Sequence, residues 1–186
     1  MTPRVRILEG LPAYGPMATP IPPEWGDSGR EGTVVECETE SDKWVANIAP
    51  GIGGLNLAHA HPNGRDAVVI ASGDLYVVNP ILRSAELLLS GVDSEIEVQQ
   101  PDGWIFCIQG VALARLGSDG LLWHTRRLSW DGVKELKLQG HCVTGVAWSL
   151  DDHWYSFQVD AHTGQSQGGS YHETDAQRWE GLAVEP

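Results

Sequence analysis

The sequence has no long apolar run. Apolar stretches such as residues 67–71 end within a few residues, whereas a membrane-spanning helix needs about 20 consecutive apolar residues. Near the N-terminus, Arg4 and Arg6 precede only two apolar residues, at positions 7 and 8, before Glu9 interrupts them. That pattern lacks the apolar core of a signal peptide. We therefore expect a protein that neither spans a membrane nor is secreted.

Basic residues are also scarce. The chain has 12 Lys and Arg against 25 Asp and Glu, a net charge of -13 at pH 7, and its longest basic cluster is the pair Arg126-Arg127. Nucleic-acid binding depends on neutralising phosphates with Lys and Arg, and an anionic membrane repels an acidic surface. We expect no nucleic-acid or membrane partner, and a partner steered by charge would be a basic protein.

Cysteine is nearly absent and unpaired. Cys37, Cys107 and Cys142 are an odd number, lie far apart and form no CxxC pair, so neither a disulfide framework nor a zinc ribbon is expected. Each lies among apolar or β-forming neighbours. They are predicted to be buried thiols in a reducing compartment, which indicates the cytoplasm.

Helical periodicity is missing from almost the whole chain, and short alternating segments take its place. In residues 34–40, Val35 and Cys37 share one face while Glu36 and Glu38 share the other, the pattern of a half-buried strand. Residues 66–71 and 75–78 flank Ser-Gly-Asp, which is the chemistry of a tight hairpin. The sequence predicts an all-β protein built of antiparallel meanders.

A weak internal repeat refines this prediction. Pro62-Asn63-Gly64 leads into an apolar run, a glycine and a second apolar run, and Pro101-Asp102-Gly103 does the same 39 residues later. A period of about 40 residues is typical of a four-stranded propeller blade. Because 186 residues hold few such units, we expect propeller-blade-like repeats in an open stack. A β-sandwich or a cupin-like barrel is the alternative.

The ends of the chain differ from its middle. Proline and glycine are dense in residues 10–32, which forbids a continuous helix or central strand. We predict a Pro/Gly-rich N-terminal arm over residues 1–31, a single β domain over 32–171 and a C-terminal tail over 172–186.

The ending also carries a resemblance. Arg126-Arg-Leu-Ser-Trp-Asp-Gly132, followed by Phe157-Gln-Val-Asp-Ala-His-Thr-Gly164 and Gly168-Gly-Ser-Tyr171, resembles a family of uncharacterised bacterial proteins. The resemblance covers about residues 31 to 171. It implies a bacterial source and a β-repeat, propeller-like fold, and it implies no activity.

His59-Ala60-His61 is the sharpest candidate for chemistry. In an extended strand both imidazoles point to the same side and could bind one metal ion. With Asp66 they resemble the first motif of cupins, which has Glu at that place, and this implies Zn, Mn or Fe. In the second cupin motif, Phe106 stands where the last metal-binding histidine belongs. We predict that both histidines are polar residues of a strand end and turn and that no cofactor is bound, and the metal site is the alternative.

Among the eight tryptophans, Trp130 and Trp154 lie in polar surroundings. Exposed aromatic side chains are typical binding anchors. Packing against a neighbouring strand or the N-terminal arm is the simpler interpretation. No complete catalytic constellation is present. We therefore predict a non-enzymatic binding module, with a basic protein as its simplest partner. The alternatives are a metal-dependent, cupin-like enzyme or sensor using His59, His61 and Asp66, and a structural domain of a larger assembly.

Overall fold

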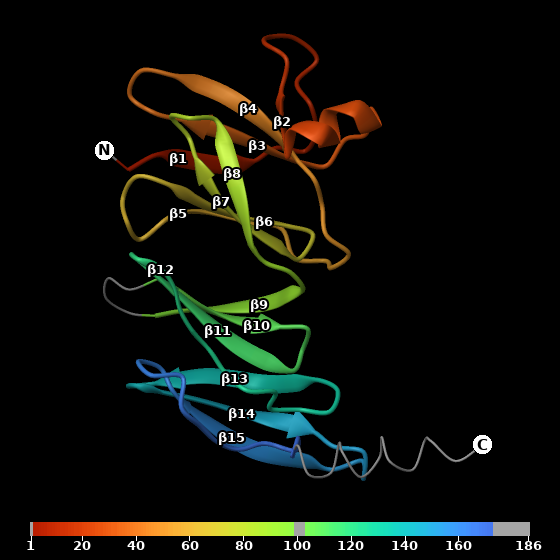
Figure 1. The fold of residues 1–186 in the computed structure, drawn as a ribbon, viewed down its shortest axis with the longest axis vertical. Helices are drawn as coiled ribbons and strands as arrows, with labels where there is room; N and C mark the ends of the chain where they lie inside the picture. Colours follow the sequence, from red (N-terminus) through yellow and green to blue (C-terminus); the bar gives the residue numbers. More distant parts are fainter. Residues whose placement is uncertain (1, 99–102, 173–186) are drawn as a thin grey trace, which may run out of the picture.

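The computed structural model describes residues 2–98 and 103–172. Within them the chain forms four four-stranded sheets that follow one another along the sequence and stack along the long axis of the molecule (Figure 1). The one helical element among these residues is the short 3-10 helix η1 (Pro23–Ser28). The predicted all-β class and the propeller-blade-like meanders are confirmed.

Each sheet has its own strands and its own two edges. The first sheet has the order β1-β3-β4-β2, with β1 (Arg4–Ile7), β3 (Thr33–Glu38), β4 (Lys43–Ile48) and β2 (Thr19–Ile21). The second consists of β5 (Leu57–Ala60), β6 (Ala67–Ala71), β7 (Asp74–Asn79) and β8 (Ser84–Leu89). Four separate sheets are neither a closed barrel nor a two-sheet sandwich, so the alternative architectures are wrong.

The last two sheets repeat the same meander. The third contains β9 (Val92–Glu97), β10 (Trp104–Ile108), β11 (Ala112–Gly117) and β12 (Gly120–His124). The fourth contains β13 (Val133–Gln139), β14 (Cys142–Trp148), β15 (Trp154–Asp160) and β16 (Ser166–Gly168). All strand pairs in these two sheets are antiparallel.

Turn chemistry sets the register of the central hairpins. Ser72 (φ 47°) and Gly73 (φ 88°) join β6 to β7, and Gln109 (φ 50°) and Gly110 (φ 64°) join β10 to β11. Two successive residues at positive φ form the hairpin turn whose twist matches that of the strands. The two turns occupy equivalent places in the second and third sheets, as expected for propeller-like meanders. Pro101 and Asp102 of the predicted repeat lie outside the described residues.

The core consists of three apolar layers, one between each pair of neighbouring sheets. Strand β6 is buried on both faces: Val69 packs toward the first sheet, while Val68 and Ile70 pack toward the third. A strand covered on both sides needs apolar residues at every position, which explains its unbroken apolar sequence. The stack is therefore held together by burial between successive sheets.

Residues 1–31, predicted to be an arm, contribute both outer strands of the first sheet. β1 pairs antiparallel with β3, and β2 pairs parallel with β4. Pro20 lies in β2, where an edge strand tolerates a missing N–H. The predicted boundary at residue 31 therefore does not separate an arm from the sheet. Of the predicted tail, residues 173–186 lie outside the described part of the chain.

The first strand of each sheet is an edge strand. β1 contacts β5, and β9 contacts β13. We call β1, β5, β9 and β13 the axial edge.

The three thiols are free; Cys37 and Cys107 are buried and Cys142 is half-buried. Within residues 2–98 and 103–172, no helix is long and apolar enough to cross a membrane.

Candidate functional site: a cleft at three hairpin tips

Three turns of the first two sheets lie close together at one side of the stack and line an open cleft of about 610 Å³. They are the β3–β4 turn, the β5–β6 turn and the β7–β8 turn, which lie on the same side of the molecule (Figure 1). We call this the hairpin-tip cleft. Its lining residues are Pro3, Thr39, Glu40, Ser41, Gly64, Arg65, Asp66, Asn79, Pro80, Ile81 and Leu82.

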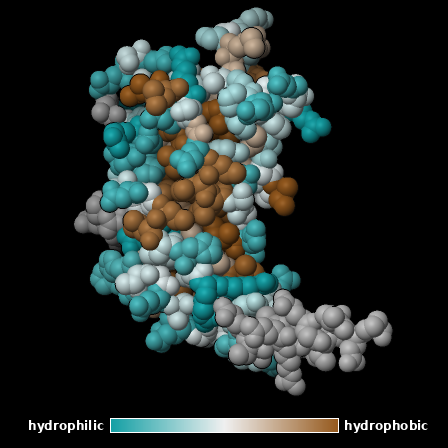
Figure 2. All heavy atoms as spheres, viewed as in Figure 1, coloured by the Kyte–Doolittle hydropathy of each residue, from teal (hydrophilic) through white to brown (hydrophobic). Residues whose placement is uncertain are grey.

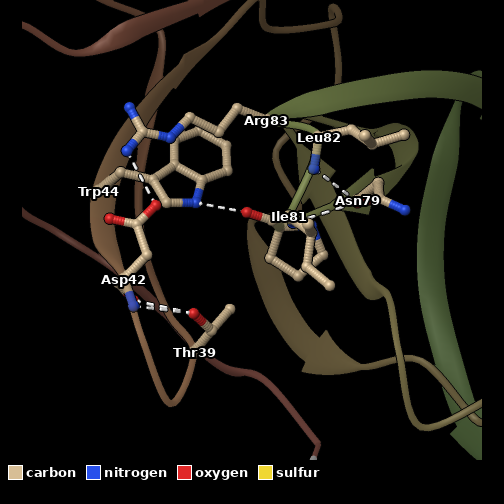
Figure 3. Close-up of polar contacts among 8 residues, drawn as sticks. Thr39, Asp42, Trp44, Asn79, Ile81, Leu82 and Arg83 are labelled. Atoms are coloured by element: carbon tan, nitrogen blue, oxygen red, sulfur yellow. Dashed lines mark hydrogen bonds and ion pairs between the residues drawn. The ribbon is translucent and has the colours of Figure 1, made fainter.

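The turns are fixed to one another by side chains. Trp44 Nε1 donates a hydrogen bond of 2.9 Å to the Pro80 carbonyl oxygen, and Arg83 Nη2 lies 2.8 Å from Asp42 Oδ2 (Figure 3). The Arg83 guanidinium also lies 5.7 Å from the centre of the Trp44 ring, within the range of a cation–π contact. These contacts join the β3–β4 turn to the β7–β8 turn across two sheets.

The β7–β8 turn presents two apolar side chains to solvent. Asn79 Oδ1 accepts hydrogen bonds from the Ile81 and Leu82 backbone N–H groups, at 3.1 and 2.8 Å (Figure 3). The turn is thereby held in a shape that leaves Ile81 80% and Leu82 74% exposed. Because apolar side chains are usually placed inside a fold, a pair held in the open on a fixed turn is a candidate contact surface.

Asp66 lies at the polar side of the cleft. Its Oδ2 accepts a 2.8 Å hydrogen bond from Asn63 Nδ2. Its Oδ1 is buried and has no hydrogen-bond partner among the described residues. A buried carboxylate oxygen without a donor is costly. Asp66 also lines the cleft, so its carboxylate is the acceptor nearest to a bound cationic or N–H group.

His61 lies behind Asp66 and is buried. Its Nδ1 accepts a 3.1 Å hydrogen bond from the Asn63 backbone N–H. Burial lowers its pKa, an effect that the nearby Asp66 charge and the Asn63 hydrogen bond oppose. One ring nitrogen is thus already committed to the turn.

His59 contacts a different set of residues. Its Nε2 lies 3.3 Å from Glu95 Oε1 of β9, and its ring stacks on Trp104 with centroids 5.0 Å apart. It also lines an open groove of about 690 Å³ along β1 and β5, which shares Pro3 with the hairpin-tip cleft. The Glu95 Oε2 atom is buried without a partner among the described residues. His59 therefore connects the second and third sheets along the axial edge.

The structure thus separates the three residues of the cupin-like motif. His59 is engaged by Glu95, whereas His61 and Asp66 are both engaged by Asn63. In the described part of the chain, no three His, Cys, Asp or Glu side chains are grouped closely enough to hold a metal ion.

Trp130 and Trp154 lie apart from the cleft. Trp130 packs edge-on against Tyr171, with ring centroids 4.9 Å apart, and Arg127 lies over both rings. Trp154 is 42% exposed on β15, opposite Trp148 of β14, with Lys134 Nζ 3.7 Å from its ring centre. Both tryptophans belong to the region of the fourth sheet, whereas the cleft belongs to the first two.

Sequence reasoning did not single out Ile81, Leu82 or Glu95. Ile81 and Leu82 follow Asn79-Pro80, a turn signal that should have indicated exposed apolar residues at a hairpin tip. Glu95 carries no such signal, because its partner His59 lies 36 residues away in another sheet.

The comparisons with known proteins give little. No protein-family model matches the chain, and no curated protein matches it. Among solved structures it is similar to the crystal structure of puromycin hydrolase, with 19% sequence identity and a TM-score of 0.43. The match covers 76% of this chain, and the chain spans about a quarter of that structure, 25% of its length.

Proposed function

We propose that this protein is a non-enzymatic binding module that takes a basic protein segment into the hairpin-tip cleft. A Lys or Arg side chain of the partner would pair with the Asp66 carboxylate, and a neighbouring apolar side chain would cover Ile81 and Leu82. The observation that carries the proposal is a cleft in which the Asp66 carboxylate lies beside the exposed apolar side chains of Ile81 and Leu82.

Charge supports a cationic partner. The lining residues include two carboxylates, on Glu40 and Asp66, and one guanidinium, on Arg65, within a protein of net charge -13. A field of this sign attracts basic segments and speeds their encounter. A hydrogen bond from an ionised donor to a carboxylate is also about twice as strong as a neutral one.

The apolar side chains supply the uncharged part of the interaction. Ile81 and Leu82 lie on a turn fixed by Asn79 and by the Trp44 and Arg83 contacts, so their burial in a complex costs little ordering of the turn. Preorganised apolar contacts beside a polar anchor are typical of binding hot spots. Figure 2 shows a larger apolar patch in the centre of the same face, and Leu87 of β8 is also exposed.

We also propose that the protein is cytoplasmic. Cys37, Cys107 and Cys142 are all free thiols, which agrees with a reducing compartment.

The experiment uses an array of synthetic 12-residue peptides in which Lys or Arg neighbours Leu, Ile or Phe, with matched peptides carrying Gln in place of the basic residue. We expect wild type to bind basic peptides with an affinity that falls as salt is added. Asp66→Asn, and separately Ile81→Ser with Leu82→Ser, should weaken binding by about tenfold or more, since one such contact contributes over about 1.4 kcal/mol.

Matched controls lie on surfaces away from the cleft. Asp119→Asn removes an exposed carboxylate from the β11–β12 turn, and Leu150→Ser removes an apolar side chain that is 51% exposed in the fourth sheet region. Both should bind as wild type does. Equal binding of Lys and Gln peptides, or unchanged binding by Asp66→Asn, would contradict the proposal.

A further inference from the structure

Two exposed histidines from separate turns of the fourth sheet meet at its surface. His141 precedes β14 and His162 follows β15. His162 Nε2 lies 2.8 Å from His141 Nδ1, and the two rings are 4.6 Å apart at an angle of 43°. Neither ring lines the hairpin-tip cleft or the groove along β1 and β5.

The backbone holds both rings in place. The Ala161 N–H donates a 2.8 Å hydrogen bond to the His141 carbonyl oxygen. Asp160 Oδ1 accepts from the backbone N–H groups of His162 and Thr163, at 2.9 and 2.8 Å. The turns are thus fixed to each other next to the imidazoles, so the ring nitrogens are brought together before any ligand arrives.

The spacing of the nitrogens suits a metal ion. Imidazole nitrogens bind divalent transition metals at about 2.0–2.1 Å, so two of them at a right angle around one ion are about 2.9 Å apart. The observed separation is 2.8 Å. We propose that His141 and His162 bind one Cu²⁺, Ni²⁺ or Zn²⁺ ion through these two nitrogens. When the ion binds, the hydrogen on the donating nitrogen moves through solvent to the other nitrogen of the same ring, so that both imidazoles bind as neutral ligands.

A hollow lies beside His141. Its volume is about 350 Å³, and Gln158, Asp160 and Gln165 lie in its wall together with His141. Because no third His, Cys, Asp or Glu of the described residues completes a ligand group, water fills the other positions. Two imidazoles with water ligands favour Cu²⁺ over Ni²⁺ and Zn²⁺.

The test titrates CuCl₂ into the full chain without a histidine tag, by calorimetry and electron paramagnetic resonance. We expect one ion per chain, with hyperfine structure from two nitrogens. His141→Ala and His162→Ala should each weaken binding by about tenfold or more and remove one nitrogen from the spectrum. His153→Ala is the control, because His153 is an exposed histidine whose ring bonds to Asp151 of its own turn.

Circular dichroism of each variant checks the fold, which exposed rings should not affect. Absence of a bound ion, or Cu²⁺ binding as tight in either single variant as in wild type, would overturn the proposal. Loss of binding in His153→Ala alone would overturn it as well.

Discussion

The guanidinium of Arg83 lies 2.8 Å from the carboxylate of Asp42, and the ring of Trp44 lies between the two turns that carry them (Figure 3). The ion pair is about half exposed, so water and salt screen it. The Trp44 hydrogen bond to Pro80 is buried. These two interactions join the same turns, but they contribute differently to stability.

We predict that Trp44→Phe lowers the free energy of unfolding by about 1–3 kcal/mol, because it leaves the buried Pro80 carbonyl oxygen without its donor. Asp42→Asn should cost less than about 1 kcal/mol. Urea titrations followed by circular dichroism measure both values. A larger loss in Asp42→Asn than in Trp44→Phe would show that the ion pair, and not the indole, holds the turns together.

The repeated Pro-Asx-Gly motif gives a second prediction. Gly64 (φ 71°) and Gly103 (φ 94°) both have positive φ. A Cβ at Gly64 meets nothing within 4 Å, whereas one at Gly103 would overlap the Leu116 carbonyl oxygen. Gly64→Ala should therefore cost about 1–2 kcal/mol of backbone strain, and Gly103→Ala about 2–5 kcal/mol, since overpacking is added.

Thermal unfolding of the two alanine variants makes this comparison, with Gly54→Ala as the reference, because Gly54 has neither a positive φ nor a close neighbour. Equal losses at Gly64 and Gly103 would mean that the β11 backbone yields to the added methyl group.

The third prediction concerns pH. Burial lowers the pKa of His61, so the folded state disfavours its protonated form. Below a pH of about 6.5 the unfolded chain binds this proton more readily than the folded one. Stability should therefore fall as the pH drops from 7 to 5. The carboxylates with lowered pKa values, Glu36, Asp151 and Asp160, act at lower pH.

His61→Asn keeps an acceptor for the Asn63 N–H and removes the titrating group. Urea midpoints of this variant should change less between pH 7 and 5 than those of wild type. His153→Asn, on an exposed turn, should follow wild type. The same slope in His61→Asn and wild type would assign the pH dependence to another group.

The sequence predicted local structure well because local chemistry determines it. Alternation in residues 33–38 and the Ser72-Gly73 turn each require only a few neighbouring residues. The repeat of about 40 residues then indicated the four-stranded sheets. The parallel pairing of β2 with β4 was not predictable in this way. It places Thr19 beside Ala46 in the sheet, although β3 lies between the two strands in the sequence.

The candidate site was less accessible to such reasoning. The spacing of His59 and Asp66 indicated a candidate metal site, but the residues that contact these side chains in the fold determine what they can bind. Glu95 reaches His59 from another sheet, and the burial of Asp66 Oδ1 depends on how three turns pack together. The spacing of residues along the chain does not predict contacts between different sheets.

Because the described sheets follow one another in a row, the first and the fourth each rest on a single neighbour (Figure 1). In a closed ring, two interfaces must break before any blade detaches, whereas here one is enough. Under a pulling force or protease digestion, the first and the fourth of the described sheets should therefore unfold before the two sheets between them. The hairpin-tip cleft, formed by the first two blades, would outlast the loss of the fourth.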